Sequence, residues 1–390
     1  MVSGDVSGDG KAEVVFGTDS GLLYVISGPD GSLMWKHQLP GSGAYAYLVD
    51  VALGRLDILV NFDLEEGVKS LCLISYPERI TVWCYDLPGL LTAPMEVVLP
   101  NGKTGIFVGF ADFSTGESGI LALDLDGVPR WKVLTGWSPI SMALGNIDGD
   151  LGDEVIATTQ GRAIALKLGG DGQPWTLLWS LDLPGDSPLV THVADLGGDD
   201  RPEVVLGAIP TAEIPRFEIS VLAGDTGIPL WTRYISDLFF SPAIGDVDGD
   251  GKGEAVLLST SGNLSVLDGS DGGELWTSTI EQPTSSPILL NLEGDEVLDI
   301  IVGIEGAVQA IRGSNGEKLW DISYGAGVSY VAAADLDGDG WDEILGVAGG
   351  TLFAIDERPP DILFMALLVG AGVGSSAMVA ILLWRRFQKK

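Results

Sequence analysis

The sequence predicts an all-β chain, a β-propeller of about eight four-stranded blades with seven as the alternative, followed by one C-terminal transmembrane helix. A tryptophan recurs every 44 to 52 residues, an acidic nine-residue loop recurs between short apolar runs, and 55 glycines supply many turns. A β-sandwich would not repeat its markers seven or eight times, and a solenoid with this period is usually helical. The repeats therefore favour a propeller.

The pattern predicts the same order in each repeat: a strand, an acidic loop, a second strand, a turn, a third strand, a turn with glycine and a fourth strand with tryptophan. The recurring tryptophans are Trp35, Trp83, Trp131, Trp179, Trp231, Trp276 and Trp320. In five of these seven repeats a glycine stands four residues earlier, at Gly31, Gly127, Gly227, Gly272 and Gly316. A large aromatic residue at one place in every blade is most simply a packing device between neighbouring blades, and ligand stacking is the alternative.

The acidic loop 246–254 has the pattern of a calcium site. Its carboxylates stand at positions 1, 3, 5 and 9, on Asp246, Asp248, Asp250 and Glu254. With the carbonyl oxygen of Lys252 and a water, they would supply the six or more oxygen ligands that Ca²⁺ takes. An EF-hand would close with a glutamate at position 12, where this chain has leucine, and apolar runs of strand length flank the loop. We therefore predict a calcium-binding hairpin between two strands.

Five further loops keep the pattern with varying fidelity. Their expected ligands, including a position-7 carbonyl in each, are Asp5, Ser7, Asp9, Lys11 and Glu13; Asn146, Asp148, Asp150, Gly152 and Glu154; Asp195, Asp199, Arg201 and Glu203; Asn291, Glu293, Asp295, Val297 and Asp299; and Asp335, Asp337, Asp339, Trp341 and Glu343. The loop at 195 has Gly197 at position 3, and the repeats near Asp50 and over 96–105 keep no complete set. Asp-Gly pairs also favour ordinary solvated turns, but such turns would not reserve positions 1, 3, 5 and 9.

The C-terminal segment 362–384 is uncharged over 23 residues, long enough as a helix to cross a hydrocarbon core of about 30 Å. A basic cluster follows it, so the positive-inside rule places the tail in the cytoplasm and the large domain outside. The expected organisation is a propeller over 1–356, a linker over 357–361, a transmembrane helix over 362–384 and a basic tail over 385–390. Ala366, Gly370 and Gly374 form a small-residue pattern suited to self-association, although glycine is also common in membrane spans.

The two cysteines, Cys72 and Cys84, flank a turn between two strand-like runs. A hairpin centred on Glu78 would put them directly opposite each other, and an exterior location would allow a disulfide. Two buried free thiols are the alternative.

The formal net charge of −34 is typical of a surface that repels nucleic acid and anionic membranes. His37 and His192 are the only histidines, and we interpret each as a structural residue. The sequence contains no nucleophile elbow, Walker loop or zinc motif. A pair of carboxylates that acts as general acid and base is still possible among the 55 acidic residues, but the sequence does not identify which two residues would form it.

Two repeat families share these features. The acidic loops, followed by Val-Phe-Gly at 15–17, Leu-Gly-Ala-Ile-Pro at 206–210 and Leu-Gly-Val-Ala at 345–348, resemble FG-GAP repeats such as those of integrin α-chain propellers. The glycine-tryptophan turns, clearest over 225–231, resemble the tryptophan-docking motif of quinoprotein propellers. The second resemblance implies a pyrroloquinoline quinone pocket with an adjacent cysteine pair, which this chain lacks. The first implies calcium loops that stiffen one face of a propeller used for protein or glycan contacts.

We therefore expect a membrane-anchored, extracytoplasmic, calcium-binding module that acts in adhesion, protein interaction or scaffolding without catalysis. A degenerate quinoprotein, a calcium-dependent polysaccharide-processing enzyme and a periplasmic assembly scaffold are the alternatives. The first repeat begins at its acidic loop and the last stops near residue 356, so we expect each to lack one strand. A gene product with an upstream signal peptide and two further strands would supply both, and a true start at Met1 is the alternative.

Overall fold

The computed structural model describes residues 1–385, apart from 53–54, 65–66, 77, 99–103, 138, 151, 170–174, 184–186, 210–216, 236, 359–360 and 370–378. Within these described ranges the regular elements are β-strands, and no α-helix occurs among them. The search of the described residues for a helix long and apolar enough to cross a membrane finds none. The chain divides into two compact units, residues 1–193 with 224–227, and residues 194–223 with 228–390.

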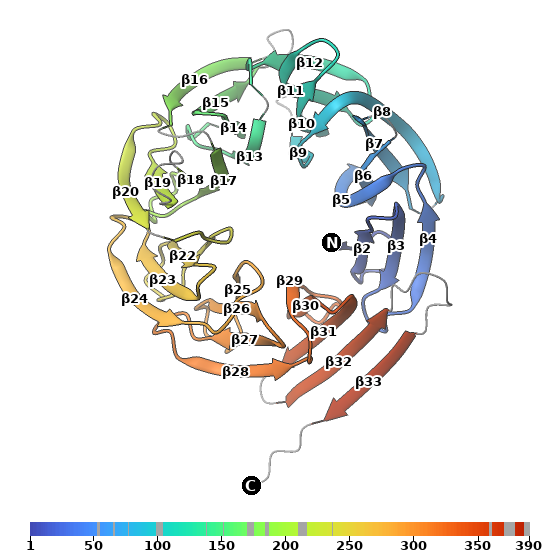
Figure 1. Cartoon of the computed structure of the whole chain (residues 1–390), viewed down its shortest axis with the longest axis vertical. Helices are drawn as coiled ribbons and strands as arrows, with labels where there is room; N and C mark the ends of the chain where they lie inside the picture. Colours follow the sequence, from blue (N-terminus) through green and yellow to red (C-terminus); the bar gives the residue numbers. More distant parts are fainter. Residues whose placement is uncertain are drawn as a thin grey trace. The chain divides into compact units, whose positions relative to one another are not determined.

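The first unit consists of antiparallel sheets whose strands mostly pair in chain order (Figure 1). Its first sheet contains β1 (Val2–Gly4), β2 (Glu13–Gly17), β3 (Leu22–Ser27) and β4 (Leu33–Gln38). Its second contains β5 (Ser42–Ala52), β6 (Arg55–Asp63), β7 (Val68–Ser75), β8 (Ile80–Leu91), β9 (Met95–Val98), β10 (Thr104–Asp112), β11 (Glu117–Asp124) and β12 (Pro129–Leu134). Its third contains β13 (Pro139–Gly145), β14 (Glu154–Thr159), β15 (Arg162–Leu168) and β16 (Trp175–Asp182). Strand β17 (Ser187–Ala194) follows.

The second unit continues the same arrangement. Strands β18 (Glu203–Ile209), β19 (Phe217–Leu222) and β20 (Pro229–Ile235) form one ladder. Two four-stranded sheets follow, β21 (Ala243–Gly245), β22 (Glu254–Leu258), β23 (Asn263–Asp268) and β24 (Glu274–Thr279), then β25 (Ile288–Leu290), β26 (Asp299–Ile304), β27 (Ala307–Ile311) and β28 (Lys318–Ser323). The last sheet contains β29 (Val328–Ala334), β30 (Glu343–Ala348), β31 (Thr351–Arg358), β32 (Asp361–Val369) and β33 (Val379–Arg385).

These sheets confirm the predicted repeat, because the acidic loop connects the first and second strands and the tryptophan lies on the fourth. Apolar side chains of successive sheets pack together in the second unit, for example Val256 and Leu264 against Ile300 and Val302, all fully buried. The eight-stranded sheet joins two repeats through the long strand β8, whose first part pairs with β7 and whose last three residues pair with β10. The number of blades stays a prediction.

The tryptophans pack on the glycine turn of the following repeat. The ring of Trp231 closes on Gly272, where an added Cβ would lie 2.8 Å from the indole, and Gly272 adopts a φ of +70°. The same close approach joins Trp83 to Gly127, Trp179 to Gly227 and Trp276 to Gly316. In these four cases the indole nitrogen also donates a hydrogen bond to a backbone carbonyl of the next repeat, at 2.7 to 2.8 Å. The interpretation of these tryptophans as packing residues is confirmed.

The predicted cysteine hairpin is also present. Cys72 on β7 pairs directly with Cys84 on β8, and a disulfide joins them. The hairpin brings the two strands together at this position, and the alternative of two free thiols is excluded.

The structure corrects both ends of the predicted repeat array. The first sheet already has the strand that we expected to be missing, because the short segment Val2–Gly4 pairs with β2 ahead of the acidic loop. Three residues are too few to show the alternation by which a strand is recognised in sequence. At the other end, Asp361–Val369 pairs with β31 and completes four strands in the last sheet.

The helix predicted over 362–384 is not confirmed. Its ends lie in strands β32 and β33, which pair with each other, and its middle, 370–378, lies outside the described residues together with the tail 386–390. A run that is apolar throughout has no period that separates a strand from a helix. Membrane attachment of this segment, and self-association through Ala366, Gly370 and Gly374, stay predictions.

Candidate metal centres

Six acidic loops share one local architecture, each lying between the first and second strands of its repeat. The residue at position 2 is apolar and at most 8% exposed in all six: Val6, Ile147, Leu196, Val247, Leu292 and Leu336. This buried side chain fixes the start of the loop against the core. The pattern of an apolar second position, visible in the sequence, therefore has a structural reason.

The position-1 side chain organises the turn. In the loop 246–254, one carboxylate oxygen of Asp246 accepts the backbone N–H of Gly249 at 2.6 Å and the other accepts that of Gly251 at 2.9 Å. Both glycines have φ near +80°, which residues with a Cβ rarely adopt. Asp5 and Asp335 make the same two contacts. The carboxylate is thereby held in one orientation before any ligand binds.

The position-9 side chain is a buried carboxylate. Glu254 is 2% exposed, and its Oε2 accepts the backbone N–H of Val247 at 2.9 Å. Burial, followed by the neighbouring carboxylates, raises the pKa of Glu154, Glu254 and Glu343 to about 7. Burial also raises the pKa of Asp299 to about 6. Each of these loops thus holds a carboxylate whose charged form is disfavoured by burial.

The predicted ligands converge in three of the six loops. Three sets have ligand oxygens that all lie within 4.8 Å of one another: Asp148 with Asp150 and Glu154; Asp246 with Asp248 and Asp250; and Asp335 with Asp337 and Asp339. Among the described residues, the loops at 5, 195 and 291 form no such set. In the loops at 5 and 195, Ser7 and Gly197 stand at position 3 in place of a carboxylate. In the loop at 291, the position-3 residue Glu293 accepts a hydrogen bond from Arg312.

A fourth set contains a residue that the sequence interpretation missed. Asp337 and Glu343 converge with Asp356, at the end of β31, within the same 4.8 Å limit, and Asp356 is 6% exposed. Asp337 belongs to both sets at this loop and so connects them. Asp356 lies 13 residues beyond Glu343 in the sequence, too far for a loop motif to include it.

Asp356 occupies a cross-strand position that recurs in every acidic repeat. On the neighbouring strand, Ser27 pairs with Glu13, Lys167 with Glu154 and Asp268 with Glu254. Extending the strand pairing by one residue puts Ala223 opposite Glu203, Arg312 opposite Asp299 and Asp356 opposite Glu343. In four repeats this residue stands eight positions before the recurring tryptophan, which is the sequence signal that could have found it.

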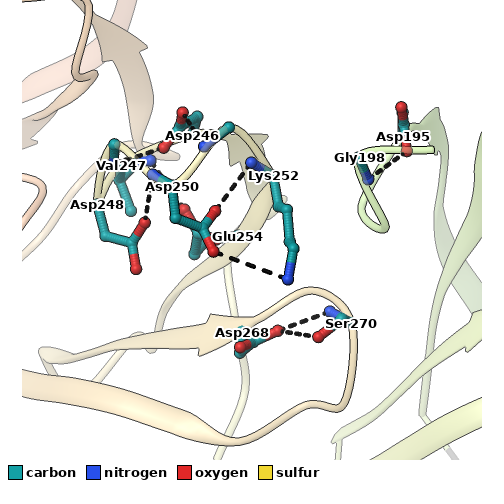
Figure 2. Close-up of polar contacts among 12 residues, drawn as sticks. Asp195, Gly198, Asp246, Val247, Asp248, Asp250, Lys252, Glu254, Asp268 and Ser270 are labelled. Carbon is teal, nitrogen blue, oxygen red and sulfur yellow. Dashed lines mark hydrogen bonds and ion pairs between the residues drawn. The ribbon is translucent and has the colours of Figure 1, made fainter. Parts of the chain in front are cut away.

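In four of the six repeats the cross-strand residue carries a charge beside the loop. The ammonium of Lys167 contacts the carboxylates of both Asp148 and Asp150, at 2.5 Å from the latter. The guanidinium of Arg312 binds both oxygens of Glu293 at 3.0 Å. In the loop 246–254 the cross-strand residue is instead Asp268, which accepts hydrogen bonds from Ser270, and the loop's own Lys252 reaches no closer than 3.8 Å to Asp250 (Figure 2).

The donor sets at 246 and 335 fit a hard divalent cation. Every candidate side-chain donor there is a carboxylate oxygen, the ligand type that Ca²⁺ and Mg²⁺ prefer, with no sulfur or imidazole. In the loop at 291, the buried Oδ2 of Asp299 has no hydrogen-bond partner, a polar atom that a cation or a proton would satisfy. The residues present therefore fit calcium, whose positive charge would bind to these carboxylate oxygens.

The two histidines are placed as structural residues. His37 on β4 stacks against Trp35 with ring centroids 5.2 Å apart. His192 on β17 has a buried Nε2 without a hydrogen-bond partner, and burial lowers its pKa. Neither histidine belongs to a carboxylate set described above.

Comparison with known proteins gives one partial family match. Residues 215–359 match the model of a PQQ-type family described as outer membrane protein assembly factor BamB. No curated protein matches the chain in sequence. The FG-GAP resemblance stays a sequence interpretation.

Solved structures extend the likeness over most of the chain. BamB from Moraxella catarrhalis aligns over 92% of this chain and 94% of its own, with a TM-score of 0.57 and 13% identity. The chain resembles BamB-type propellers in fold. Sqt1 from Saccharomyces cerevisiae aligns over 92% and 95% with a TM-score of 0.65 and 10% identity. BBS1N, solved in complex with ARL6DN, aligns over 78% and 88% with a TM-score of 0.52 and 14% identity. At these identities the likeness concerns the fold alone.

Proposed function

We propose that the chain is a calcium-stabilised propeller that acts as a protein-interaction or assembly scaffold outside the cytoplasm. The observation that carries the calcium part is the cluster at the loop 335–343, where two sets of three converging carboxylates share Asp337. Bringing such charges together without a counter-ion costs free energy, and a bound cation removes that cost. Calcium would then stiffen the loops on one side of each repeat.

The scaffold part is supported by the fold. The partial family match is to an assembly factor, and BBS1N was solved with a protein partner. Propellers present loops from successive blades on one surface, which suits binding of another protein. The role that these observations support best is binding of another protein.

The test combines metal dependence with partner binding. The full chain is used as bait in cells, with crosslinking, in Ca²⁺ and in EGTA, beside the variant Asp337→Asn. The proposal expects one set of partners that is enriched in Ca²⁺ and reduced both by EGTA and by the variant. Partner sets that are identical in all three conditions would contradict a calcium-dependent scaffold.

Membrane attachment through 362–384 forms part of the proposal, supported by the absence of charge over 23 residues. The large domain would then lie outside and the basic end inside. Fractionation of cells that express the full chain, or a chain ending at residue 361, tests it. The full chain should sediment with membranes and resist alkaline extraction, whereas the shortened chain should not. Equal extraction of both would contradict the attachment.

A further inference from the structure

Successive acidic loops of the second unit contact one another in a regular way. In each contact the position-7 side chain of one loop lies over the position-4 glycine of the loop before it. An added Cβ at Gly249 would lie 3.0 Å from Cγ2 of Val297, and one at Gly294 would lie 3.0 Å from Cη2 of Trp341. Three successive loops therefore form a contiguous row.

The same contact joins the loop 195–203 to the loop 246–254. An added Cβ at Gly198 would lie 3.1 Å from Cγ of Lys252, whose ammonium lies 3.8 Å from Asp250 of its own loop (Figure 2). The contact to the earlier loop therefore uses the aliphatic part of the lysine. Lysine, valine and tryptophan have only apolar atoms in common at this place, so the shared feature of the three contacts is packing.

The loop 291–299 stands between two loops whose carboxylates converge. Its Gly294 lies under Trp341 of the loop that follows, and its Val297 packs on the loop that precedes it. The backbone N–H of Val297 donates a hydrogen bond to Oδ1 of Asp295 at 3.2 Å. Both contact points therefore belong to one hydrogen-bonded turn, which connects the two carboxylate sets.

A backbone hydrogen bond adds a second link between this loop and the preceding one. The N–H of Leu298 donates to the carbonyl oxygen of Asp246 at 3.0 Å. Leu298 also packs on Gly245, where an added Cβ would lie 2.7 Å from its Cδ1. The side chain of Asp246 orients the turn of its own loop, so the link reaches the residue on which that turn depends.

We propose that Val297 and Trp341 are positioning residues that couple the carboxylate sets at 246 and 335, so that calcium binding at one set strengthens binding at the other. This inference rests on the proposed calcium function and specifies how two of its sites communicate. Neither side chain contributes a ligand atom, so each acts through the loop that it contacts.

The coupling follows from what a bound ion would fix. A cation in the loop 335–343 would bind the carbonyl oxygen of Trp341, and the ordered tryptophan side chain would then restrain Gly294. Val297 would be ordered through the same turn, and Gly249 beneath it. The second ion would meet ligands that are already ordered, so its binding would lose less conformational entropy.

The experiment measures Ca²⁺ binding to the purified full chain by isothermal titration calorimetry. Trp341→Ala and Val297→Ala remove a contact but leave every carboxylate and backbone carbonyl in place. Each should weaken calcium affinity about five-fold and reduce the cooperativity of the titration. Trp137→Ala is the control for loss of a tryptophan, because Trp137 is 57% exposed, and it should bind calcium as the wild type does.

Two further measurements separate coupling from a structural role. A purely structural loss would lower the melting temperature equally in EGTA and in Ca²⁺, whereas loss of coupling should lower it more in Ca²⁺. Asp337→Asn should weaken binding at the remaining sites in the wild-type background and leave it unchanged in a Val297→Ala background, where the connecting contact is gone.

The outcomes distinguish this inference from the calcium function itself. Wild-type binding with unchanged affinity in Trp341→Ala or Val297→Ala would overturn the inference and leave the calcium function standing. The same holds for an equal loss in Trp137→Ala, or for an equal effect of Asp337→Asn in both backgrounds. Absence of binding by the wild type would overturn both.

Discussion

The indole nitrogen of Trp231 donates a hydrogen bond to the carbonyl oxygen of Gly269 over 2.7 Å, joining β20 of one repeat to the turn of the next. Trp231 is 8% exposed and belongs to a core that includes Leu257 and Leu267 of the following sheet. This one side chain therefore links neighbouring repeats in two ways, by packing in their shared core and by donating a hydrogen bond.

Removal of this side chain should loosen the second unit. Trp231→Ala should lower the free energy of unfolding by about 3–5 kcal/mol, because the buried indole leaves a cavity and an unsatisfied carbonyl. The matched control is Trp137→Ala, since Trp137 is 57% exposed. Chemical denaturation followed by tryptophan fluorescence measures both. Equal losses for the two variants would contradict the docking role.

An added side chain at Gly272, the glycine against which the Trp231 indole packs, should destabilise the protein. Gly272→Ala places a Cβ 2.8 Å from the Trp231 indole at a φ of +70°, so steric overlap and backbone strain act together. We expect a loss of about 1–3 kcal/mol. Gly251→Ala is a control with a similar φ of +85° but nothing within 4 Å of the added Cβ, so it reports strain alone. A smaller loss for Gly272→Ala than for Gly251→Ala would count against ring docking.

The disulfide should contribute measurably to the first unit. Cys72 and Cys84 are 12 residues apart, and closing a loop of that size stabilises a fold by about 3 kcal/mol in the chain-entropy model. Cys72→Ser/Cys84→Ser should lower the unfolding midpoint. A reducing agent should lower the wild-type midpoint and leave that of the variant unchanged. The prediction would be refuted if the unfolding midpoint of the wild type did not change on addition of the reducing agent.

The buried glutamates should make the calcium-free protein less stable as pH rises. Glu343 has a pKa of about 7 in the folded chain against 4.5 ordinarily, so the folded state binds its proton more tightly than the unfolded state does. Its stabilisation is complete below about pH 4.5 and is lost as pH rises to 7, by at most about 1.4 kcal/mol per pH unit.

Denaturation in EGTA at pH 5 and at pH 7.5 tests whether the stability falls as the pH rises. Glu343→Gln should reduce the difference between the two pH values, because the amide keeps the shape without titrating. Glu117→Gln, at an exposed carboxylate, is the control. A pH dependence that Glu343→Gln leaves unchanged would show that this residue is not its source.

Much of the fold could be predicted from periodicity. The tryptophans and acidic loops mark most repeats because packing requires a large residue at one place and the turn requires a carboxylate at another. The strand Val2–Gly4 cannot be recognised from the sequence because three residues show no alternation, and the apolar run 362–384 has no period that distinguishes a strand from a helix.

The candidate sites were only partly predictable. The loop residues are contiguous, so their spacing identified them and the structure brings three sets together. Asp356, Lys167 and Arg312 come from the next strand, and only the register shows that they face the loop. A motif read along the chain therefore identifies the candidate loop residues but misses the residues that face them from the next strand.

Thermal unfolding of the full chain in millimolar Ca²⁺ and in EGTA tests the central claim most directly. Asp337 joins both carboxylate sets at the loop 335–343, so Asp337→Asn should remove part of any calcium effect. The wild type should melt at a higher temperature in Ca²⁺, and the variant should gain less, because calcium-site affinities in extracellular modules lie near 10⁻⁴–10⁻³ M. A wild-type melting temperature that is the same in Ca²⁺ and in EGTA would contradict the account.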